Sequence, residues 1–364
     1  MTLPTRALCF ALLQAQQSVA LLERCQPQNL RRELLRVQAA WREGREVSPQ
    51  FQYAPLPPLQ DARSGLAAFA ELTTCGPWGE LFSERAAEIA SEAALLQALG
   101  TPEFLRASRH RYWLPQAATL TEATAVAERW LESPPVGEDQ LHRTDDLRDP
   151  RSLLRRIEAL LGQRGVSFRV QVSANLVPVA ATGDGVIVVA ADRWLSALET
   201  ERVAVHEVLA HALPRALATQ PLWQLGTAGA ADDEEGRALL LEQRHDLMGS
   251  ERRWSLALRH MAAYALFNGG SFVDIVRTLL GRGCATDLAV LIAARVCRGG
   301  GLGREIVYLP ALLRVSAGLQ RNPTLERWFE RGRVSLHWAQ RLEHMGELPR
   351  ELPVAQDRLA MTGQ

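Results

Sequence analysis

The pattern of apolar and polar positions divides the chain into a long helical first part, a short part with strand periodicity and a helical last part. Apolar residues recur at helical spacing over residues 30–41, 83–99, 120–131, 152–161 and 335–344. Val166, Phe168, Val170 and Val172 instead alternate with polar residues, which is typical of a half-buried strand. The pattern therefore predicts an α+β protein that is mainly α-helical.

Two further apolar runs, at 176–180 and 186–190, flank a Thr-Gly-Asp-Gly sequence at 182–185. Glycine and aspartate between such runs favour a tight hairpin turn. We therefore expect a small antiparallel sheet immediately before the helix that contains His206. An edge strand there would be able to bind an extended peptide by strand addition. The alternative is a sheet that only packs against the helix.

The segment 131–150, which contains a proline pair and a polar run, is the predicted linker between two parts of the chain. Residues 1–130 are the mainly helical N-terminal region, residues 151–350 form the second domain, and residues 351–364 are a C-terminal tail. The apolar stretch 7–22 is interrupted by glutamines and lacks a basic leader. It predicts an amphipathic helix rather than a signal peptide.

Composition excludes several classes of function. The net charge is zero, so no general attraction to nucleic acid or to an anionic membrane is expected, and no run is long enough to span a membrane. All 41 basic residues are arginine, which excludes enzymes that use a lysine nucleophile or Schiff base. The five cysteines are scattered, which favours free thiols in a reducing compartment and a cytoplasmic protein. The sequence does not indicate an oligomeric state.

The strongest chemical signal is His206, Glu207 and His211, which form a His-Glu-x-x-x-His pattern. Two imidazoles and a carboxylate suit a tetrahedral zinc with one open position, and Glu207 stands where a general base is needed. Residues five apart on a regular helix are offset by about 140°, which would turn the imidazoles away from each other. A single π-type turn would bring them together, and Pro214 predicts a kink or helix end nearby.

An acidic run follows at residues 232–235, and a second helix starts there. Acidic residues are favoured in a first helical turn, which accounts for Asp232 and Asp233 without any metal. That account explains less well a carboxylate at Glu235, which precedes Gly236 on a helix after the histidine helix. The two segments together predict a zinc peptidase with a zincin-like catalytic domain, in which the small antiparallel sheet lies beside the HExxxH helix.

The chain resembles the QEGLA-motif proteins, which are related to the microtubule-associated tyrosine carboxypeptidases. The resemblance lies in the HExxxH segment, the Glu-Glu-Gly-Arg-Ala sequence at 234–238, a Pro-x-Phe-x-Tyr element at 49–53, Arg-x-x-Arg-Gly at 295–299 and Tyr-Leu at 308–309. Dipeptidyl peptidase III is similar in the same zinc motifs. Arg237 and Ala311 depart from the residues that the QEGLA pattern favours, which puts the substrate in question.

The resemblance implies a set of roles. Zinc would be held by His206, His211 and Glu235, with Glu207 as the general base. Tyr308 is the favoured donor to the developing negative charge, with His245 and Tyr264 as alternatives, and His245 is also a candidate for the second shell of the metal. A guanidinium suits a terminal carboxylate, and Arg298 followed by Arg295 are the candidates.

These roles predict a zinc metallopeptidase, of a carboxypeptidase kind, that acts on the C-terminal tail of a peptide or protein. Internal cleavage, or cleavage of an isopeptide or γ-glutamyl bond, stays open. The alternative is a non-catalytic helical protein that interacts with partners and retains a structural zinc site. Glu207 discriminates between them, because a degenerate site commonly loses its general base.

Overall fold

The computed structural model describes residues 5–56, 59, 65–135, 140–174, 176 and 178–346. Helices dominate, as predicted. The helices before the sheet are α1 Thr5–Val19, α2 Leu21–Arg24, α3 Leu30–Arg42, η1 Ala68–Cys75, α5 Pro77–Gln97, α6 Pro102–Ser108, η2 Arg109–Trp113, η3 Leu114–Gln116 and α7 Ala117–Leu131. The central elements are β1 Leu141–Arg143, α8 Leu153–Arg164, β2 Arg169–Ser173, β3 Ala180–Thr182, β4 Val186–Ala190, β5 Trp194–Ser196, α9 Ala197–Val205, η4 His206–Ala212 and α10 Leu213–Leu217.

The last part of the described chain is entirely helical. Its elements are α11 Pro221–Leu225, α12 Ala230–Arg244, α13 Ser250–Phe267, α14 Phe272–Gly281, α15 Thr286–Cys297, η5 Arg298–Gly300, η6 Arg304–Val307, α16 Tyr308–Arg321, η7 Pro323–Leu325, α17 Glu326–Glu330 and α18 Leu336–His344. None of the helices in the described segments is both long and apolar enough to cross a membrane. The predicted tail, 351–364, lies outside the described residues.

The predicted hairpin is confirmed and forms most of a three-stranded sheet. β3 pairs antiparallel with β4, with Thr182 opposite Ile187, across the turn at 183–185. β2 joins the other side of β4 in the parallel direction, so the order is β2-β4-β3 and β3 lies at an edge. A separate antiparallel pair joins β1 to β5. The sheet beside the HExxxH helix therefore contains one antiparallel and one parallel pairing.

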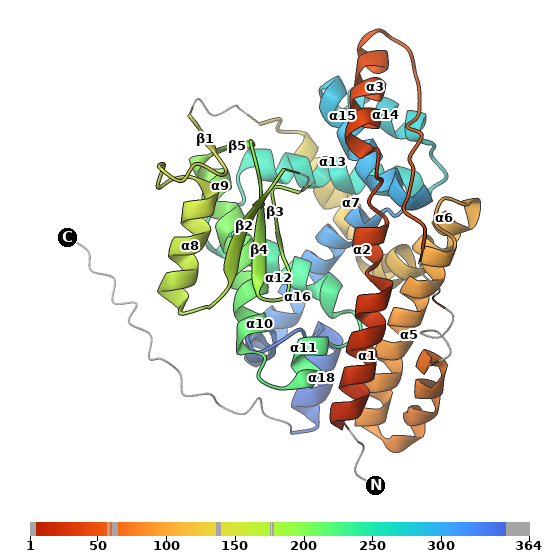
Figure 1. The fold of residues 1–364 in the computed structure, drawn as a ribbon, viewed down its shortest axis with the longest axis vertical. Helices are drawn as coiled ribbons and strands as arrows, with labels where there is room; N and C mark the ends of the chain where they lie inside the picture. The colour runs from red at the N-terminus through yellow and green to blue at the C-terminus, as the bar shows by residue number, and fades with distance from the viewer. Residues whose placement is uncertain are drawn as a thin grey trace, which may run out of the picture.

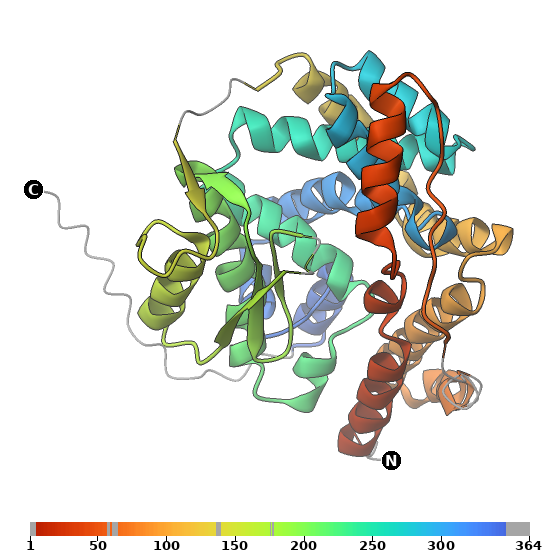
Figure 2. The ribbon, with the colours of Figure 1, turned by 45° about the horizontal axis from the view of Figure 1, so that its top comes forward.

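Two hydrophobic cores hold the fold together. The smaller core lies between the three-stranded sheet and the helices α8, α9 and η4, and it includes Ile187 of β4, Ile157 of α8 and Val208 of η4. The larger core joins helices from both ends of the chain, from Cys9 in α1 to Leu342 in α18. Figures 1 and 2 show α1, α3 and α5 on one side of the molecule and the sheet with α8 on the other. Contacts of the larger core thus cross the predicted linker, and the domain division stays a prediction.

Asn29 has a different role from the helix cap that its position suggests. It precedes α3, but its side chain makes no capping hydrogen bond. Instead Oδ1 accepts from the backbone N–H of Gln52 at 2.9 Å, and Nδ2 donates to the carbonyl of Gln50 at 2.8 Å. Asn29 therefore fastens the extended segment 49–53 to the start of α3. Tyr53 at the end of that segment accepts a hydrogen bond from the N–H of Gly299 at 2.6 Å.

Candidate metal site and its surroundings

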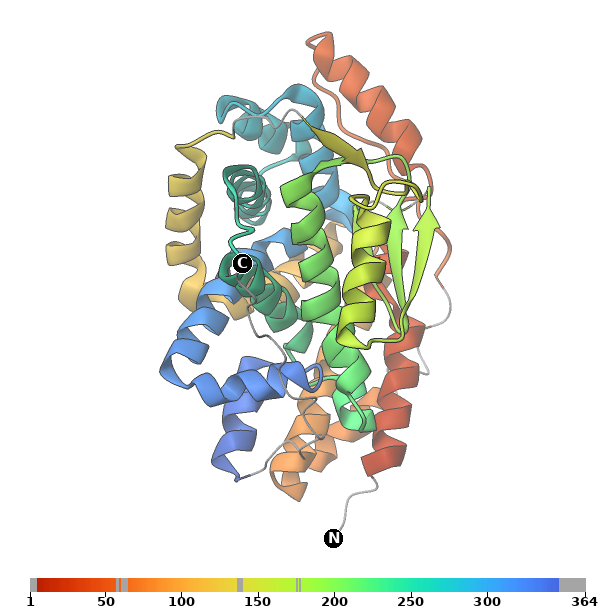
Figure 3. The ribbon, with the colours of Figure 1, turned by 90° about the vertical axis from the view of Figure 1, so that its left-hand side faces the viewer.

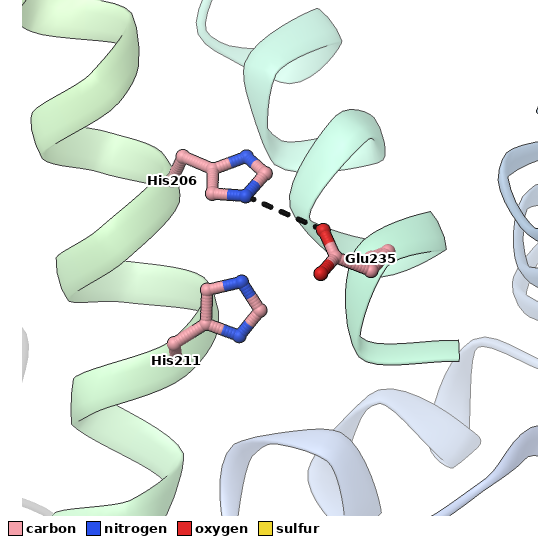
Figure 4. A group of neighbouring side chains, drawn as sticks. All are labelled: His206, His211 and Glu235. Atoms are coloured by element: carbon pink, nitrogen blue, oxygen red, sulfur yellow. Dashed lines mark ion pairs between the residues drawn. The ribbon is translucent and has the colours of Figure 1, made fainter. Parts of the chain in front are cut away.

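His206, His211 and Glu235 converge from two helices. One ligand atom from each lies within 4.8 Å of the others, and Figure 4 shows both imidazoles on the same side of η4, facing α12. His206 Nε2 and Glu235 Oε2 are 3.5 Å apart. Within the described ranges this is the one group of three or more His, Cys, Asp or Glu residues close enough to hold a metal ion.

A widened helix turn brings the two histidines together, as predicted. α9 is capped by Ser196, whose hydroxyl accepts from the N–H of Glu199 at 3.1 Å. The helix then passes into a π-helical segment over His206–Ala212 and returns to α-helical geometry in α10. Figure 3 shows these elements as one continuous column beside α8 and the sheet. The π-turn absorbs the extra residue of the HExxxH spacing.

Pro214 follows this turn and leaves a gap in the helix hydrogen bonds, because proline has no N–H to donate. The missing donor would serve the carbonyl of Leu209 in π-helical register or that of Ala210 in α-helical register. Arg237 from α12 reaches both carbonyls, at 3.3 Å and 3.4 Å from its Nη1. A buried guanidinium thus replaces the proline's missing donor. The helix ends at Leu217, three residues after the proline.

The helix that carries Glu235 packs very closely against α16. A Cβ at Gly236 would lie 2.5 Å from the carbonyl carbon and oxygen of Ala311. Only glycine fits at this position without moving one of the two backbones. This close approach explains the small residue after the ligand, and it places Ala311, a departure from the QEGLA pattern, directly at the contact.

Each of the four carboxylates at 232–235 faces an arginine from a different part of the chain. The closest pairs are Asp232–Arg111 at 3.1 Å, Asp233–Arg314 at 2.6 Å, Glu234–Arg333 at 3.2 Å and Glu235–Arg304 at 3.1 Å. The N-cap of α12 is Gly229, and no side chain caps the helix. Asp232 and Asp233 do lie in the first turn of α12, as predicted, but their side chains pair with arginines and do not cap the helix. These four ion pairs connect the start of α12 to four other parts of the chain. Of the four carboxylates, Glu235 is the one that also forms an ion pair with a histidine, His206.

Glu242 is the polar partner of the first histidine. Its Oε1 accepts a hydrogen bond from His206 Nδ1–H at 2.7 Å, which leaves Nε2 directed at Glu235. Glu242 is fully buried and accepts from the guanidinium of Arg252 at 2.8 Å and from Arg202 at 3.3 Å. Carboxylates in this position orient a metal-binding imidazole and fix its tautomer.

His245 does not occupy the second-shell position that the sequence suggested. It is the C-cap of α12 and is exposed to solvent, ten residues beyond Glu235. Ten helical residues span about 15 Å, so its side chain lies well away from the ligands. Glu242, seven residues after Glu235, is on the same helix face and takes that role.

The charges around the ligands set their protonation. Burial disfavours a charged His206, but hydrogen bonds to Glu235 and Glu242 outweigh burial and raise its pKa to about 10. Burial lowers the pKa of His211, whose Nδ1 is buried without a partner. Burial alone would raise the pKa of Glu235, but Arg304 and the imidazoles lower it well below its usual value. The site therefore offers an ionised carboxylate and a neutral imidazole.

These residues fit a zinc ion. Nitrogen from two imidazoles and oxygen from one carboxylate are the donors of many catalytic zinc sites. The partnerless Nδ1 of His211 is a buried polar atom that the protein itself does not satisfy. The contact between His206 Nε2 and Glu235 joins two groups that would both turn to a shared cation.

Glu207 is held at the edge of the sheet. The hydroxyl of Thr182 in β3 donates to Glu207 Oε2 at 2.7 Å, and Thr182 Oγ1 also lies 3.2 Å from the backbone carbonyl oxygen of Glu207. Glu207 itself is 8% exposed. The edge strand therefore fixes the rotamer of the carboxylate that adjoins the first histidine.

Tyr308 lies next to the third ligand, whereas the alternative donors do not. Arg304 bridges the two, with Nη1 3.3 Å from the Tyr308 hydroxyl and Nη2 3.1 Å from Glu235 Oε1. The guanidinium of Arg259 stacks on the Tyr308 ring, 4.7 Å from its centre. Tyr264 instead packs with Trp113, with ring centres 5.4 Å apart.

Arg295 and Arg298 lie in the same arginine-rich region but not in contact with the metal ligands. Arg295 forms an ion pair with the buried Glu305. Arg298 has a buried Nε without a partner. Both arginines line a small cavity of about 20 Å³ between α3 and α15, with Leu30 and Leu291. The sequence placed these arginines near the site, and missed Arg304, which touches it.

Sequence reasoning also missed Thr182 and Glu242. Weak signals existed for both. Thr182 immediately precedes the predicted hairpin turn, and Glu242 stands two helical turns after Glu235. Neither signal is specific, because the pairing of β3 with η4 and of α12 with α9 decides what each side chain meets.

The fold and the site define a helix-rich α+β protein in which two histidines and a glutamate are close enough to hold a metal ion. Residues 41–348 match the family model of the microtubule-associated tyrosine carboxypeptidases. The match covers most of the chain, and the protein belongs to this family. The resemblance noted in the sequence is confirmed, and membership implies an enzyme of the carboxypeptidase kind. No curated protein matches the chain.

Proposed function

We propose that this protein is a zinc-dependent carboxypeptidase that removes a residue from the C-terminal tail of a peptide or protein. One observation carries the proposal: His206, His211 and Glu235 converge within 4.8 Å while Glu207 is held beside them by Thr182. The family match supports the carboxypeptidase part. The intact Glu207 disfavours a purely structural zinc site.

A zinc ion held by His206, His211 and Glu235 would supply an activated water and would polarise the carbonyl of the scissile bond. Glu207 takes a proton from the attacking water and passes it to the leaving amine. The hydrogen bond from Thr182 to Oε2 holds that carboxylate in one orientation during the transfer. Glu242 keeps the Nδ1 proton of His206 in place, so Nε2 is the ring nitrogen that would bind the metal.

Arg304 and Tyr308 are the donors for the charge that develops on the carbonyl oxygen. Both are next to Glu235, and the guanidinium orients the phenol through a 3.3 Å hydrogen bond. Preorganised donors in a partly buried site commonly contribute about 10²–10³-fold to the rate. The substrate backbone extends along β3, the edge strand that carries Thr182. Arg298 and Arg295 serve the terminal carboxylate.

The test combines metal analysis with the variant Glu207→Gln. The purified protein is expected to hold about one zinc per chain. Glu207→Gln should keep that zinc while kcat on a responsive peptide falls about 10²–10⁴-fold, since it loses only the proton transfer. Peptides from a library are followed by mass spectrometry, which reports whether one residue leaves from the C-terminus.

Glu201→Gln is the matched control, because Glu201 lies on α9 in a half-exposed pair with Arg156. It should leave zinc content and kcat unchanged. A protein that binds zinc and cleaves peptides equally well with and without Glu207 would refute the mechanism. Cleavage within the peptide, rather than at its end, would refute the carboxypeptidase assignment alone.

A further inference from the structure

The last residue of strand β3 directs its backbone toward the free edge of the sheet. Thr182 stands opposite Ile187 of β4, and the next residue, Gly183, donates its N–H to the carbonyl of Val186. Hydrogen-bonded and non-hydrogen-bonded pairs alternate along an antiparallel pairing, so the N–H and C=O of Thr182 point away from β4. They belong to the edge with which a peptide would pair by strand addition.

Arg215 occupies the outward carbonyl of Thr182. Its Nη1 donates to that oxygen at 2.7 Å. Its Nη2 lies 3.6 Å from Oε2 of Glu234, which also pairs with Arg333. Arg215 belongs to α10, the continuation of the helix that carries His211, and Glu234 immediately precedes the third ligand on α12. One guanidinium therefore connects the edge of the sheet to both helices of the candidate metal site.

The hydroxyl of the same threonine holds the proposed general base. Thr182 Oγ1 donates to Glu207 Oε2 at 2.7 Å. Threonine is branched at Cβ, which restricts its side chain to few rotamers, so the position of the hydroxyl follows the position of the backbone. A carbonyl held by Arg215 therefore fixes the point from which the hydroxyl reaches Glu207.

The end of β3 is a place where such a contact is needed. The strand has three residues, Ala180–Thr182, and Thr182 is the last before the turn. The ends of short edge strands open more readily than central strands do. The side chain of Arg215 is 16% exposed and that of Glu234 is 8% exposed, so solvent and salt weaken this contact less than they weaken a surface ion pair.

We propose that Arg215 is a positioning residue of the reaction, which holds the Thr182 hydroxyl against Glu207 by binding the Thr182 carbonyl. This inference rests on the proposed carboxypeptidase function and deepens it, because it names what keeps the general base in place. A peptide on β3 pairs with the outward groups of Ala180 and leaves the Thr182 carbonyl to Arg215.

The first measurement compares kcat and KM of zinc-loaded variants on one responsive peptide. Arg215→Gln should lower kcat about 10–100-fold, since misplacing a catalytic group by about 1 Å costs up to about 100-fold. KM should change by less than about twofold, because the substrate does not use the carbonyl that Arg215 binds. Arg215→Lys, which keeps the charge but not the planar fork, should recover part of kcat. Zinc content should match that of the wild type.

Arg155→Gln is the matched control. Arg155 on α8 also joins a backbone carbonyl to a glutamate, with 3.0 Å to the carbonyl of Leu147 and 2.8 Å to Glu158. These partners contribute nothing to the candidate site, so kcat and KM should equal the wild-type values. Thermal melting shows whether each variant is folded, and Arg215→Lys takes the place of Arg215→Gln in every comparison if the latter is not.

Two double-mutant cycles decide whether Arg215 acts through Thr182 and Glu207. Thr182→Val removes the hydroxyl and should lower kcat at least as much as Arg215→Gln does. The double variant should be no slower than Thr182→Val alone, because the hydroxyl that Arg215 positions is already gone. For the same reason, Arg215→Gln should cause no further loss of kcat in Glu207→Gln, which lacks the base.

Hydrogen exchange of the metal-free protein, followed by mass spectrometry, gives a readout without turnover. Peptides that cover residues 180–186 should exchange faster in Arg215→Gln, because the end of β3 is released. Thr182→Val keeps the carbonyl that Arg215 binds and should exchange at the wild-type rate, as should Arg155→Gln.

Four results would overturn the inference and leave the carboxypeptidase function standing. A rise in KM with an unchanged kcat would make Arg215 a substrate-binding residue. Loss of zinc from Arg215→Gln would mean that Arg215 acts on the metal ligands. Losses that multiply in the Thr182 cycle, or in the Glu207 cycle, would show that Arg215 acts independently of that residue.

Failure of the proposed function is a separate result. If the zinc-loaded wild type cleaves no peptide, the carboxypeptidase assignment fails, and hydrogen exchange then judges the arginine. Equal exchange rates over residues 180–186 in the wild type and in Arg215→Gln overturn the inference, whereas faster exchange in the variant supports the hold of Arg215 on β3.

Discussion

Two charged regions adjoin the candidate metal site, and both are built on arginine. On α12, every carboxylate of the run 232–235 has an arginine partner, and Glu242 has two. In the region around Tyr308, arginines outnumber carboxylates, and Arg259 and Arg298 have no acceptor among the described residues. One region is balanced in charge and the other has an excess of positive charge.

The difference separates groups whose charges are paired within the fold from groups whose charges the described residues leave unpaired. Balanced, hydrogen-bonded ion pairs hold helices in one register and leave nothing for a substrate. An excess of one charge is stable in a protein only when solvent or a ligand compensates it. The absence of lysine fits the balanced region, because a planar guanidinium is able to bridge several carboxylates at once.

The strongest test of the comparison removes one arginine from each region. Arg111→Met leaves Asp232 and two further buried carboxylates short of a partner, so we expect a loss of about 3–5 kcal/mol in the free energy of unfolding. Arg298→Met removes a charge that repels Arg295 and Arg304 but attracts Glu305, and the opposing effects should leave the free energy changed by no more than about 1 kcal/mol. Urea titration at pH 7 measures both.

Arg321→Met, at an exposed position, sets the baseline for losing any arginine. Equal destabilisation by Arg111→Met and Arg298→Met would mean that the excess charge around Tyr308 is compensated within the protein. That result would contradict the proposed difference between the two regions.

Acid titration sharpens the comparison at Glu305, the buried carboxylate of the arginine-rich region. Burial alone would raise its pKa, but Arg295, Arg298 and Arg259 outweigh burial and lower it to about 2. A lowered pKa stabilises the fold above the unfolded pKa of about 4.3, and that contribution is lost as the pH falls toward 2. The shift corresponds to roughly 3 kcal/mol. Glu305→Gln should therefore lose less stability than the wild type between pH 5 and pH 3.

Urea midpoints at pH 7, 5 and 3 measure this difference. Glu201→Gln removes a half-exposed carboxylate and should follow the wild-type curve. Parallel curves for the wild type and Glu305→Gln would show that the three arginines do not stabilise the ionised carboxylate.

The local geometry of the site was largely predictable from sequence. The five-residue spacing of His206 and His211 requires a π-turn if both bind one ion, and the hairpin at 183–185 follows from turn chemistry. Helix boundaries at α3, α7, α8 and α18 lie within a few residues of the apolar periodicity. Such features depend on neighbours along the chain.

The parts that sequence did not reveal depend on which helices meet. In the sequence, Asp232 and Asp233 are typical of acidic residues in a first helical turn. Their partners, Arg111 and Arg314, lie about 80 or more residues away in the chain. The sequence pointed to His245 as the second-shell candidate and missed Glu242, because periodicity does not say which side chain contacts His206. A contact that depends on tertiary packing produces no periodic pattern of apolar and polar residues in the sequence.

Glu242 tests whether the balanced region acts on the metal or only on the fold. Glu242→Gln keeps an acceptor for His206 Nδ1–H but loses the charge that two arginines compensate. We expect zinc affinity to fall about 10–100-fold, as for other changes to the partner of a metal-binding histidine. Competition with a chromophoric chelator at pH 7 gives the affinity, with Glu201→Gln as the control. An unchanged affinity in a folded variant would limit Glu242 to a structural role.

Arg237 is the exception in the balanced region, because it donates to backbone carbonyls instead of a carboxylate. Arg237→Leu, which restores the residue of the QEGLA pattern, leaves the carbonyls near Pro214 short of a donor. A buried unsatisfied carbonyl costs about 1–3 kcal/mol, and the long distances of 3.3 and 3.4 Å favour the lower value. Pro214→Ala returns an N–H to the helix, so the loss caused by Arg237→Leu should shrink in that background. Thermal or urea unfolding of the wild type, the two single variants and the double variant completes the double-mutant cycle. An Arg237→Leu effect of equal size in both backgrounds would mean that the guanidinium stabilises the helix pair by packing alone, independently of the proline.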